Sequence, residues 1–331
     1  MSDKNQERFD NPARGVRLTL VDGDVPRLEA AVTRENVELR ASVRVKPGTD
    51  LPLLIAAAQD PGAPEEDRHR AARLTQRTEI AFRRIARLIG AAADWLVTGR
   101  ENTNHTYDLT PLNQLYLAHT LALVTGKPFA EMQGYIVEPA ADTALIDHLA
   151  AVRAGHPAGL RAVAEPAARF GRRLGWYAIA RALKPKLIVE TGVDKGLGGA
   201  LLCAALLRNT DEGAPGQYIG TDIREDAGYL VSGAYSAVGR IVYGDSLASL
   251  AALKQPIDLF INDSDHDPAY EAREYTAITR LLHKDSVILS DNAHGTDILA
   301  RFAADTGRKF IFFREQPADH WYPGAGIGIA F

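Results

Sequence analysis

The pattern of hydrophobic and polar positions along the chain changes near residue 155. Beyond that point, short continuous apolar runs alternate with longer helical segments. Such runs are typical of strands buried on both faces, and their alternation with helices predicts an α/β fold with a doubly wound parallel sheet. Only a short loop separates the last two runs, so we expect the final pair of strands to be antiparallel. The expected strands are 186–190, 217–223, 240–246, 257–263, 286–292, 309–315 and 326–331.

The first half of the chain has a different pattern. Apolar and polar residues alternate over 16–47, which predicts a small hairpin or sheet. Apolar residues then recur at steps of three and four over 68–98, as on one face of a helix. Thr110 before a proline is a good helix start, and Gly126 is a good stop. We therefore expect three parts: a small β element with a linker (1–60), a helical auxiliary domain (61–157) and the α/β domain (158–331).

Composition narrows the class of protein. Hydrophobic residues make up 46% and charged residues 24%, as in an ordinary globular protein. A net charge of −4 without a long basic run argues against a nucleic-acid partner. The single cysteine, Cys203, excludes an internal disulfide and is expected in the core. No signal-peptide pattern or membrane-length apolar run occurs, so we expect a cytoplasmic protein with a small-molecule substrate.

One acidic residue falls at the end of each of five successive expected strands. Ligands bind doubly wound sheets at this carboxyl edge. The repeated acids therefore favour a ligand site over a set of ordinary solvated loops. The residues are Glu190, Asp222, Asp245, Asp263 and Asp291.

The first of these acids precedes a glycine-rich turn, TGVDKGLGG. The spacing matches neither G-x-G-x-x-G nor a phosphate-binding loop. An acid followed by Gly192 and Gly196 suits a cationic or hydroxyl-rich ligand, although a plain tight turn is the alternative. Asp222 can accept both hydroxyls of a ribose, and Asp245 with Ser246 can meet an adenine edge.

In the motifs VETGVDKGLGG, TDI and GDS, and in the antiparallel end of the sheet, the chain resembles the class I S-adenosylmethionine-dependent methyltransferases. The resemblance covers about residues 165–331 and implies a Rossmann-like fold. It implies that Glu190, Gly192 and Gly196 flank the methionine part of the cofactor. By the same resemblance, Asp222 holds the ribose, and Asp245 with Ser246 holds the adenine.

A second polar group forms where INDSDHDPAY (261–270) and SDN (290–292) end neighbouring strands. Asp263, Asp291 and Asn292 would supply hard oxygen ligands of the kind that Mg²⁺ or Mn²⁺ accepts. The alternative is a solvated strand end with an aspartate as helix cap. Asp267 before Pro268 is the natural start of the next helix.

This arrangement resembles the metal-dependent small-molecule O-methyltransferases of the catechol and caffeoyl-CoA types. His266 stands where those enzymes have a lysine. A histidine at this position is more similar to macrocin-type sugar O-methyltransferases and cephalosporin-hydroxylase-like proteins. The resemblance implies that Asp263, Asp291 and Asn292 bind the metal and that His266 is the general base. Asp265 would be a further ligand or would orient His266.

Other polar residues give weaker signals. His294 is a possible ligand or substrate contact, and the loop before the last strand (His320, Trp321 and Tyr322) is a possible pocket wall. The 102–108 loop, with His105 and Tyr107, is a possible lid. The arginine-rich segments 68–87 and 169–173 are most simply solvated helix faces.

The sequence thus predicts a homo-oligomeric, Mg²⁺-dependent enzyme that methylates a hydroxyl of a small molecule, such as a natural-product sugar or a catechol-like ring. The front domain would shape the acceptor site or mediate oligomerisation. Metal-independent methylation of nitrogen or carboxylate is one alternative. A non-catalytic cofactor-binding subunit that assists an oxidase is another, whereas the acidic balance disfavours methylation of RNA.

Overall fold

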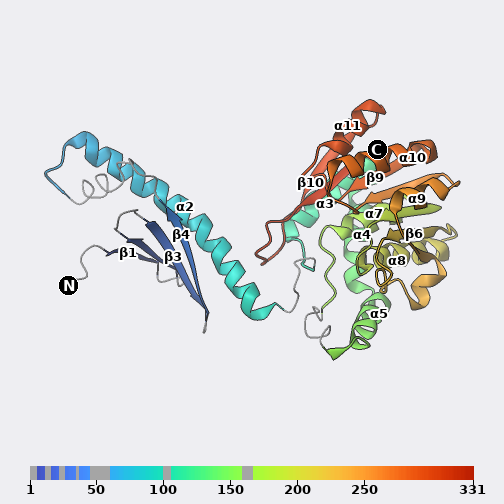
Figure 1. Ribbon diagram of the computed structural model, residues 1–331, viewed down its shortest axis with the longest axis horizontal. Helices are drawn as coiled ribbons and strands as arrows, with labels where there is room; N and C mark the ends of the chain where they lie inside the picture. The colour runs from blue at the N-terminus through green and yellow to red at the C-terminus, as the bar shows by residue number, and fades with distance from the viewer. Residues whose placement is uncertain are drawn as a thin grey trace. The chain divides into compact units, whose positions relative to one another are not determined.

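The chain divides into two compact units. The first comprises Met1–Gly99 with Asp319–Tyr322, and the second comprises Arg100–Ala318 with Pro323–Phe331. The relative placement of the units is not defined, so each stands by itself (Figure 1). The computed structural model describes residues 6–11, 16–21, 27–34, 37–44, 60–99, 106–158 and 167–331.

The first unit pairs a small sheet with a long helix. The described strands form an antiparallel sheet in the order β1-β2-β3-β4, which confirms the expected β element and adds a strand before it. Helix α2 (Glu65–Thr98) packs against β3 and β4. No described helix has both the length and the apolar run needed to cross a membrane. The strands are β1 (Gln6–Asn11), β2 (Val16–Val21), β3 (Arg27–Arg34) and β4 (Val37–Arg44).

The second unit is built on a mixed sheet. Within the described residues its strand order is β10-β11-β9-β8-β5-β6-β7. Strands β5 to β9 pair in parallel, whereas β11 is antiparallel to both β9 and β10, which confirms the predicted fold class. The strands are β5 (Leu187–Thr191), β6 (Gln217–Asp222), β7 (Gly239–Tyr243), β8 (Ile257–Asn262), β9 (Leu282–Ser290), β10 (Phe310–Arg314) and β11 (Gly326–Ala330).

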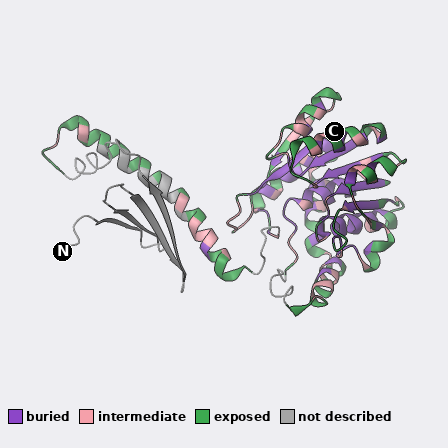
Figure 2. Ribbon diagram, viewed as in Figure 1, coloured by how far each residue is buried: buried purple, intermediate pink, exposed green. Residues whose placement is uncertain are grey.

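Helices cover the sheet, and the buried residues concentrate on its central strands (Figure 2). All five residues of β5 are buried, as expected of a central parallel strand. Cys203 is buried on α8, which confirms its place in the core. The helices after residue 167 are α7 (Arg173–Leu183), α8 (Leu197–Asp211), α9 (Ser246–Ala252), α10 (Pro268–Ile278) and α11 (Ile298–Asp305), with 3-10 turns at Gly233–Ala237 and Thr279–Leu281.

Three earlier helices also belong to the second unit. They are α3 (Pro111–Thr125), α4 (Phe129–Ala141) and α5 (Thr143–Ala154). The start of α3 is as predicted: Thr110 accepts a hydrogen bond from the backbone N–H of Asn113, and Gly126 ends the helix with φ 67°. The unit boundary at Gly99 therefore differs from the expected domain boundary at 157.

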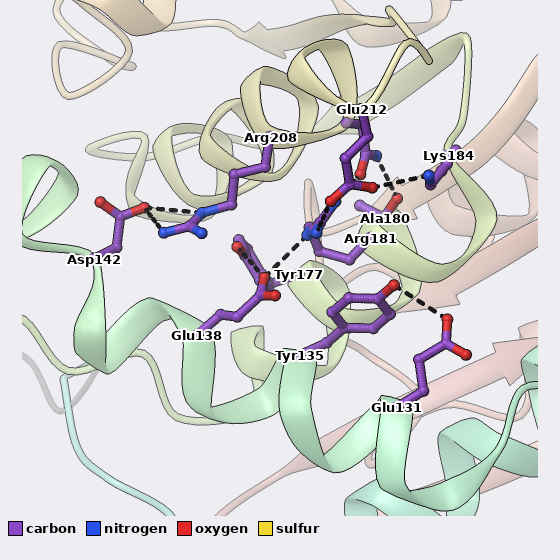
Figure 3. Close-up of polar contacts among 11 residues, drawn as sticks. Glu131, Tyr135, Glu138, Asp142, Tyr177, Ala180, Arg181, Lys184, Arg208 and Glu212 are labelled. Atoms are coloured by element: carbon purple, nitrogen blue, oxygen red, sulfur yellow. Dashed lines mark hydrogen bonds and ion pairs between the residues drawn. The ribbon is translucent and has the colours of Figure 1, made fainter.

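A buried arginine fastens α4 to α7 and α8 (Figure 3). The guanidinium of Arg181 donates to Glu138 at 3.0 Å and to Glu212 at 2.5 Å, and it also contacts the amide oxygen of Asn209. Tyr177 donates to the same Glu138 carboxylate at 2.8 Å. A buried charge is costly unless every donor has a partner, so this network fixes the helices in one arrangement.

Candidate active site at the carboxyl edge of the sheet

The topology brings three strand ends into one row. Chain order reverses between β5 and β8. On one side of β5 lie β6 and β7, whereas β8 and β9 lie on its other side. Thr191 pairs with Asn262, and Asn262 pairs with Ser290. The next residues along each strand lie side by side at the switch point, where this fold binds ligands. They are Gly192, Asp263 and Asp291.

Gly192 sits where a side chain cannot. Its φ is 79°, and an added Cβ would lie 2.1 Å from the carbonyl oxygen of Asp263. Gly196, with φ 87°, then begins α8. Both positions favour glycine, so the backbone of the turn comes directly against the end of β8.

Glu190 lies in the interior beneath this turn. Its carboxylate accepts a hydrogen bond of 2.7 Å from the Tyr218 hydroxyl. Burial raises the pKa of Glu190 to about 7, although the Tyr218 hydrogen bond partly opposes the shift. The predicted contact of Glu190 with the methionine part of a cofactor stays a prediction.

The raised pKa of Glu190 predicts that stability falls as pH rises. The folded state holds the proton more tightly than an unfolded chain with the ordinary pKa of 4.5. The stabilisation is therefore fully present below pH 4.5 and is lost as pH rises through about 7, about 3 kcal/mol in all. In the cofactor-free protein, we expect Glu190→Gln to remove this pH-dependent part of the free energy of unfolding, as measured with urea. Parallel pH profiles for the variant and the wild type would contradict it.

Asp222 ends β6 with both oxygens facing backbone donors. They accept hydrogen bonds from the N–H groups of Asp194 at 3.0 Å and Arg224 at 2.9 Å. The Arg224 guanidinium in turn donates to the Asp194 carboxylate at 2.8 Å. These contacts fix the carboxylate of Asp222 at the mouth of the glycine turn.

Asp245 and Ser246 begin α9. Asp245 is its N-cap and accepts from the backbone N–H of Ala248 at 3.0 Å. Ser246 is buried, and its hydroxyl lies 2.8 Å from that of Tyr270. A structural role thus accounts for both side chains, and their predicted adenine contacts stay predictions.

Glu274, on α10, is a buried carboxylate behind the site that the sequence did not reveal. It is fully buried, and its carboxylate accepts from the hydroxyls of Thr191 at 3.2 Å and Ser264 at 2.8 Å. It also accepts short hydrogen bonds from Asn262 and Ser246. Burial raises its pKa, which these hydrogen bonds partly oppose. One carboxylate therefore ties together the ends of β5 and β8 and the start of α9.

The acidic pair at the ends of β8 and β9 lies against a buried arginine. Both oxygens of Asp291 accept from Arg172, Oδ2 from Nη2 at 2.5 Å and Oδ1 from Nε. Burial opposes ionisation of Asp291, but the charge and hydrogen bonds of Arg172 lower its pKa. Burial, followed by the charge of Asp291, raises the pKa of Asp263 well above its ordinary range. Asp291 thus carries the negative charge that Arg172 balances.

The far side of Arg172 is also held. Its Nη1 donates to the Tyr107 hydroxyl at 2.8 Å and to Glu315 at 3.4 Å. The residue is only 5% exposed, so the interpretation of 169–173 as a solvated helix face is wrong at this position. Tyr107 is equally buried and donates to Glu315 at 2.8 Å. Of the expected lid, 102–105 with His105 lies outside the described residues.

The three expected metal ligands do not all have oxygens that are free to bind a metal ion. Asn292 supports a cation, because its buried Oδ1 has no partner among the described residues. However, Arg172 already engages both oxygens of Asp291. A divalent ion about 4 Å from that guanidinium would be repelled by about 8 kcal/mol at an effective dielectric near 20. We conclude that the donor set does not fit Mg²⁺ or Mn²⁺.

His266 lies in the exposed loop between β8 and α10. Asp265 accepts from the backbone N–H of Asp267 at 3.1 Å, and Asp267 caps α10 by accepting from Tyr270 at 2.9 Å. The predicted helix start is confirmed, whereas a contact between Asp265 and His266 is not among the described interactions. The Nδ1 atom of His294 lies 2.9 Å from the carbonyl oxygen of Asp291.

The loop expected to form a pocket wall belongs to the first unit. His320, Trp321 and Tyr322 belong to the first unit, where the Trp321 ring centroid lies 5.2 Å from that of Trp95. Their predicted contact with a substrate stays a prediction.

A mixed sheet with an antiparallel last strand and a glycine turn at the switch point defines the class I methyltransferase architecture. Residues 189–293 match the family described as "Methyltransferase domain". The matched segment runs from β5 past Asn292, so it contains the glycine turn and the acidic strand ends. The chain therefore carries a methyltransferase domain of the class I, S-adenosylmethionine-dependent type, and the resemblance read from the sequence is confirmed.

Two solved structures are similar to part of the chain at low identity. The methyltransferase PaMTH1 of Podospora anserina, bound to S-adenosylhomocysteine, is 17% identical with a TM-score of 0.38, over 57% of this chain and 87% of its own. The O-methyltransferase TomG of Streptomyces achromogenes, bound to S-adenosylmethionine, is 18% identical with a TM-score of 0.36, over 46% of this chain and 75% of its own. Such values carry no argument about substrate. No protein of curated function matches the chain.

Proposed function

We propose that the protein transfers a methyl group from S-adenosylmethionine to a hydroxyl of a small molecule, with His266 as general base. The observation that carries this proposal is the row of Gly192, Asp263 and Asp291, which sets the glycine turn beside the loop that holds His266. Natural-product sugars and catechol-like rings are the acceptor classes that we propose, and a homo-oligomer is the proposed assembly.

Each group would have a separate role. When bound, S-adenosylmethionine supplies an electrophilic methyl group. Asp222 accepts hydrogen bonds from the ribose hydroxyls, while the lack of side chains at Gly192 and Gly196 leaves room for the methionine part. Asp245 and Ser246 face the adenine. His266 removes the proton of the acceptor hydroxyl as its oxygen attacks the methyl group, and the methyl–sulfur bond breaks to release S-adenosylhomocysteine.

Magnesium receives no step in this proposal. The unpaired Oδ1 of Asn292 favours a cation, but the guanidinium of Arg172 on Asp291 opposes one more strongly. The same contact favours a metal-independent transfer. Methylation of nitrogen or of a carboxylate remains the second candidate because it needs no metal either.

Asp222→Asn should weaken the binding of S-adenosylhomocysteine by about 10- to 100-fold, because hydrogen bonds to a charged group contribute about 1.5–3 kcal/mol. Isothermal titration calorimetry would measure the change. Asp305→Ala, at the exposed end of α11, is the matched control and should bind as the wild type does. Unchanged affinity in Asp222→Asn would place the ribose elsewhere.

The reaction itself is tested with methyl-labelled S-adenosylmethionine and a panel of sugars, catechols, amines and carboxylic acids. Label that appears in an O-methyl ether supports the proposal. Label that appears only in an amine or an ester supports the second candidate.

A further inference from the structure

Arg172 is buried among groups that fit its side chain. The Tyr107 ring packs over the backbone at Gly171, where φ is 51° and an added Cβ would lie 2.7 Å from the ring. This packing brings the Tyr107 hydroxyl to Nη1 of Arg172. The arginine is therefore fixed from behind by groups remote in sequence from the acidic pair it faces.

All three guanidinium nitrogens of Arg172 have partners. Nε and Nη2 form a paired contact with the two oxygens of Asp291, and Nη1 reaches Tyr107 and Glu315. A planar guanidinium matches a carboxylate in this two-point geometry, whereas a lysine could supply only a point charge. The contact is consequently specific to arginine.

We infer that Arg172 is a built-in cation that replaces a divalent metal at the ends of β8 and β9. It supplies positive charge to Asp291, the residue that would otherwise be the metal ligand, and it keeps a second cation away by repulsion. The acceptor site is then assembled without metal, with Asp263, Asp291 and Asn292 serving as structure around the acceptor. This inference concerns the proposed site but does not depend on which acceptor is methylated.

The test is a titration of the full-length protein with Mn²⁺, followed by electron paramagnetic resonance of the free ion. The wild type should show no site tighter than about 10⁻⁴ M, which is weaker than protein sites for divalent ions usually are. Arg172→Met removes the charge at similar length, and should bind Mn²⁺ at least about tenfold more tightly than the wild type. The double variant Arg172→Met with Asp291→Asn should lose that gain.

Tight Mn²⁺ binding by the wild type would overturn the inference, as would an Arg172→Met variant that folds and gains no site. If Arg172→Met does not fold, the wild-type titration still decides, because a metal-dependent site must bind Mn²⁺ itself. The wild type should also keep its full rate of methyl transfer after dialysis against EDTA. If none of the acceptors is methylated, the result counts against the proposed function. The Mn²⁺ titration would still test the inference about Arg172.

Discussion

Replacing His266 by alanine should lower kcat for methyl transfer by about 10²- to 10⁴-fold, the usual contribution of a general base. The loss arises because an unactivated hydroxyl is a weak nucleophile toward the sulfonium methyl group. His266 lies in an exposed loop, so the substitution leaves no cavity and should not change the stability of the fold. Transfer of labelled methyl under saturating cofactor would give kcat, once an acceptor is found.

A matched variant separates base catalysis from loop structure. His69→Ala removes another exposed histidine, on α2, and should leave kcat unchanged. Binding of S-adenosylhomocysteine to His266→Ala should match the wild type, because the proposed cofactor contacts lie on β5, β6 and α9. If kcat of His266→Ala equals that of the wild type, another group is the base. If cofactor affinity falls in step with kcat, the histidine supports the loop and has no role in proton transfer.

Replacing Glu274 by alanine should lower the free energy of unfolding of the second unit by about 3–5 kcal/mol. Four donors, three of them buried, would lose their acceptor, and each unsatisfied donor costs about 1–3 kcal/mol before water relieves part of the loss. Urea unfolding followed by circular dichroism would measure the change.

Glu274→Gln is the informative comparison. It keeps one acceptor oxygen but points an NH₂ group at donors, so it should cost less than alanine and still more than about 1 kcal/mol. Glu225→Ala, an exposed acid in the loop after β6, should cost less than about 0.5 kcal/mol. A loss below about 1 kcal/mol for Glu274→Ala would show that the four donors find other partners.

The positions of Asp263 and Asp291 could be predicted because they depend on local signals. An apolar run gives a strand, and the residue after it must lie at the carboxyl edge of a parallel sheet. The N-caps at Thr110 and Asp267 were predictable for a similar reason, since a cap contacts backbone only three residues away.

The partners of these acids could not be predicted in the same way. Arg172 pairs with a residue 119 positions further along the chain, and only the folded sheet brings the two together. In sequence it belongs to RFGRR, which is indistinguishable from a solvated basic turn. Glu274 likewise reads as one more charge on a helix in AREYTAI, because periodicity cannot tell a buried acceptor from an exposed one.

The boundary of the second unit shows the same limit. Helices α3 to α5 have helical periodicity, which predicts what they are but not what they pack on. The attachment of α4, for example, depends on Arg181, whose partners are Glu138 on α4 and Glu212 at the end of α8. Pairings of this kind depend on tertiary structure, so the sequence does not reveal that α3 to α5 group with the sheet in one compact unit.

The contact between Gly192 and the end of β8 has a consequence for how specificity can change. Because the turn at Gly192 lies against the carbonyl of Asp263 with no side chain between them, the ends of β5 and β8 are held at a fixed spacing. Their spacing is consequently set by the main chain and is insensitive to most side-chain replacements nearby. New acceptors could then be accommodated by altering peripheral loops while the methyl group and its target oxygen stay in line.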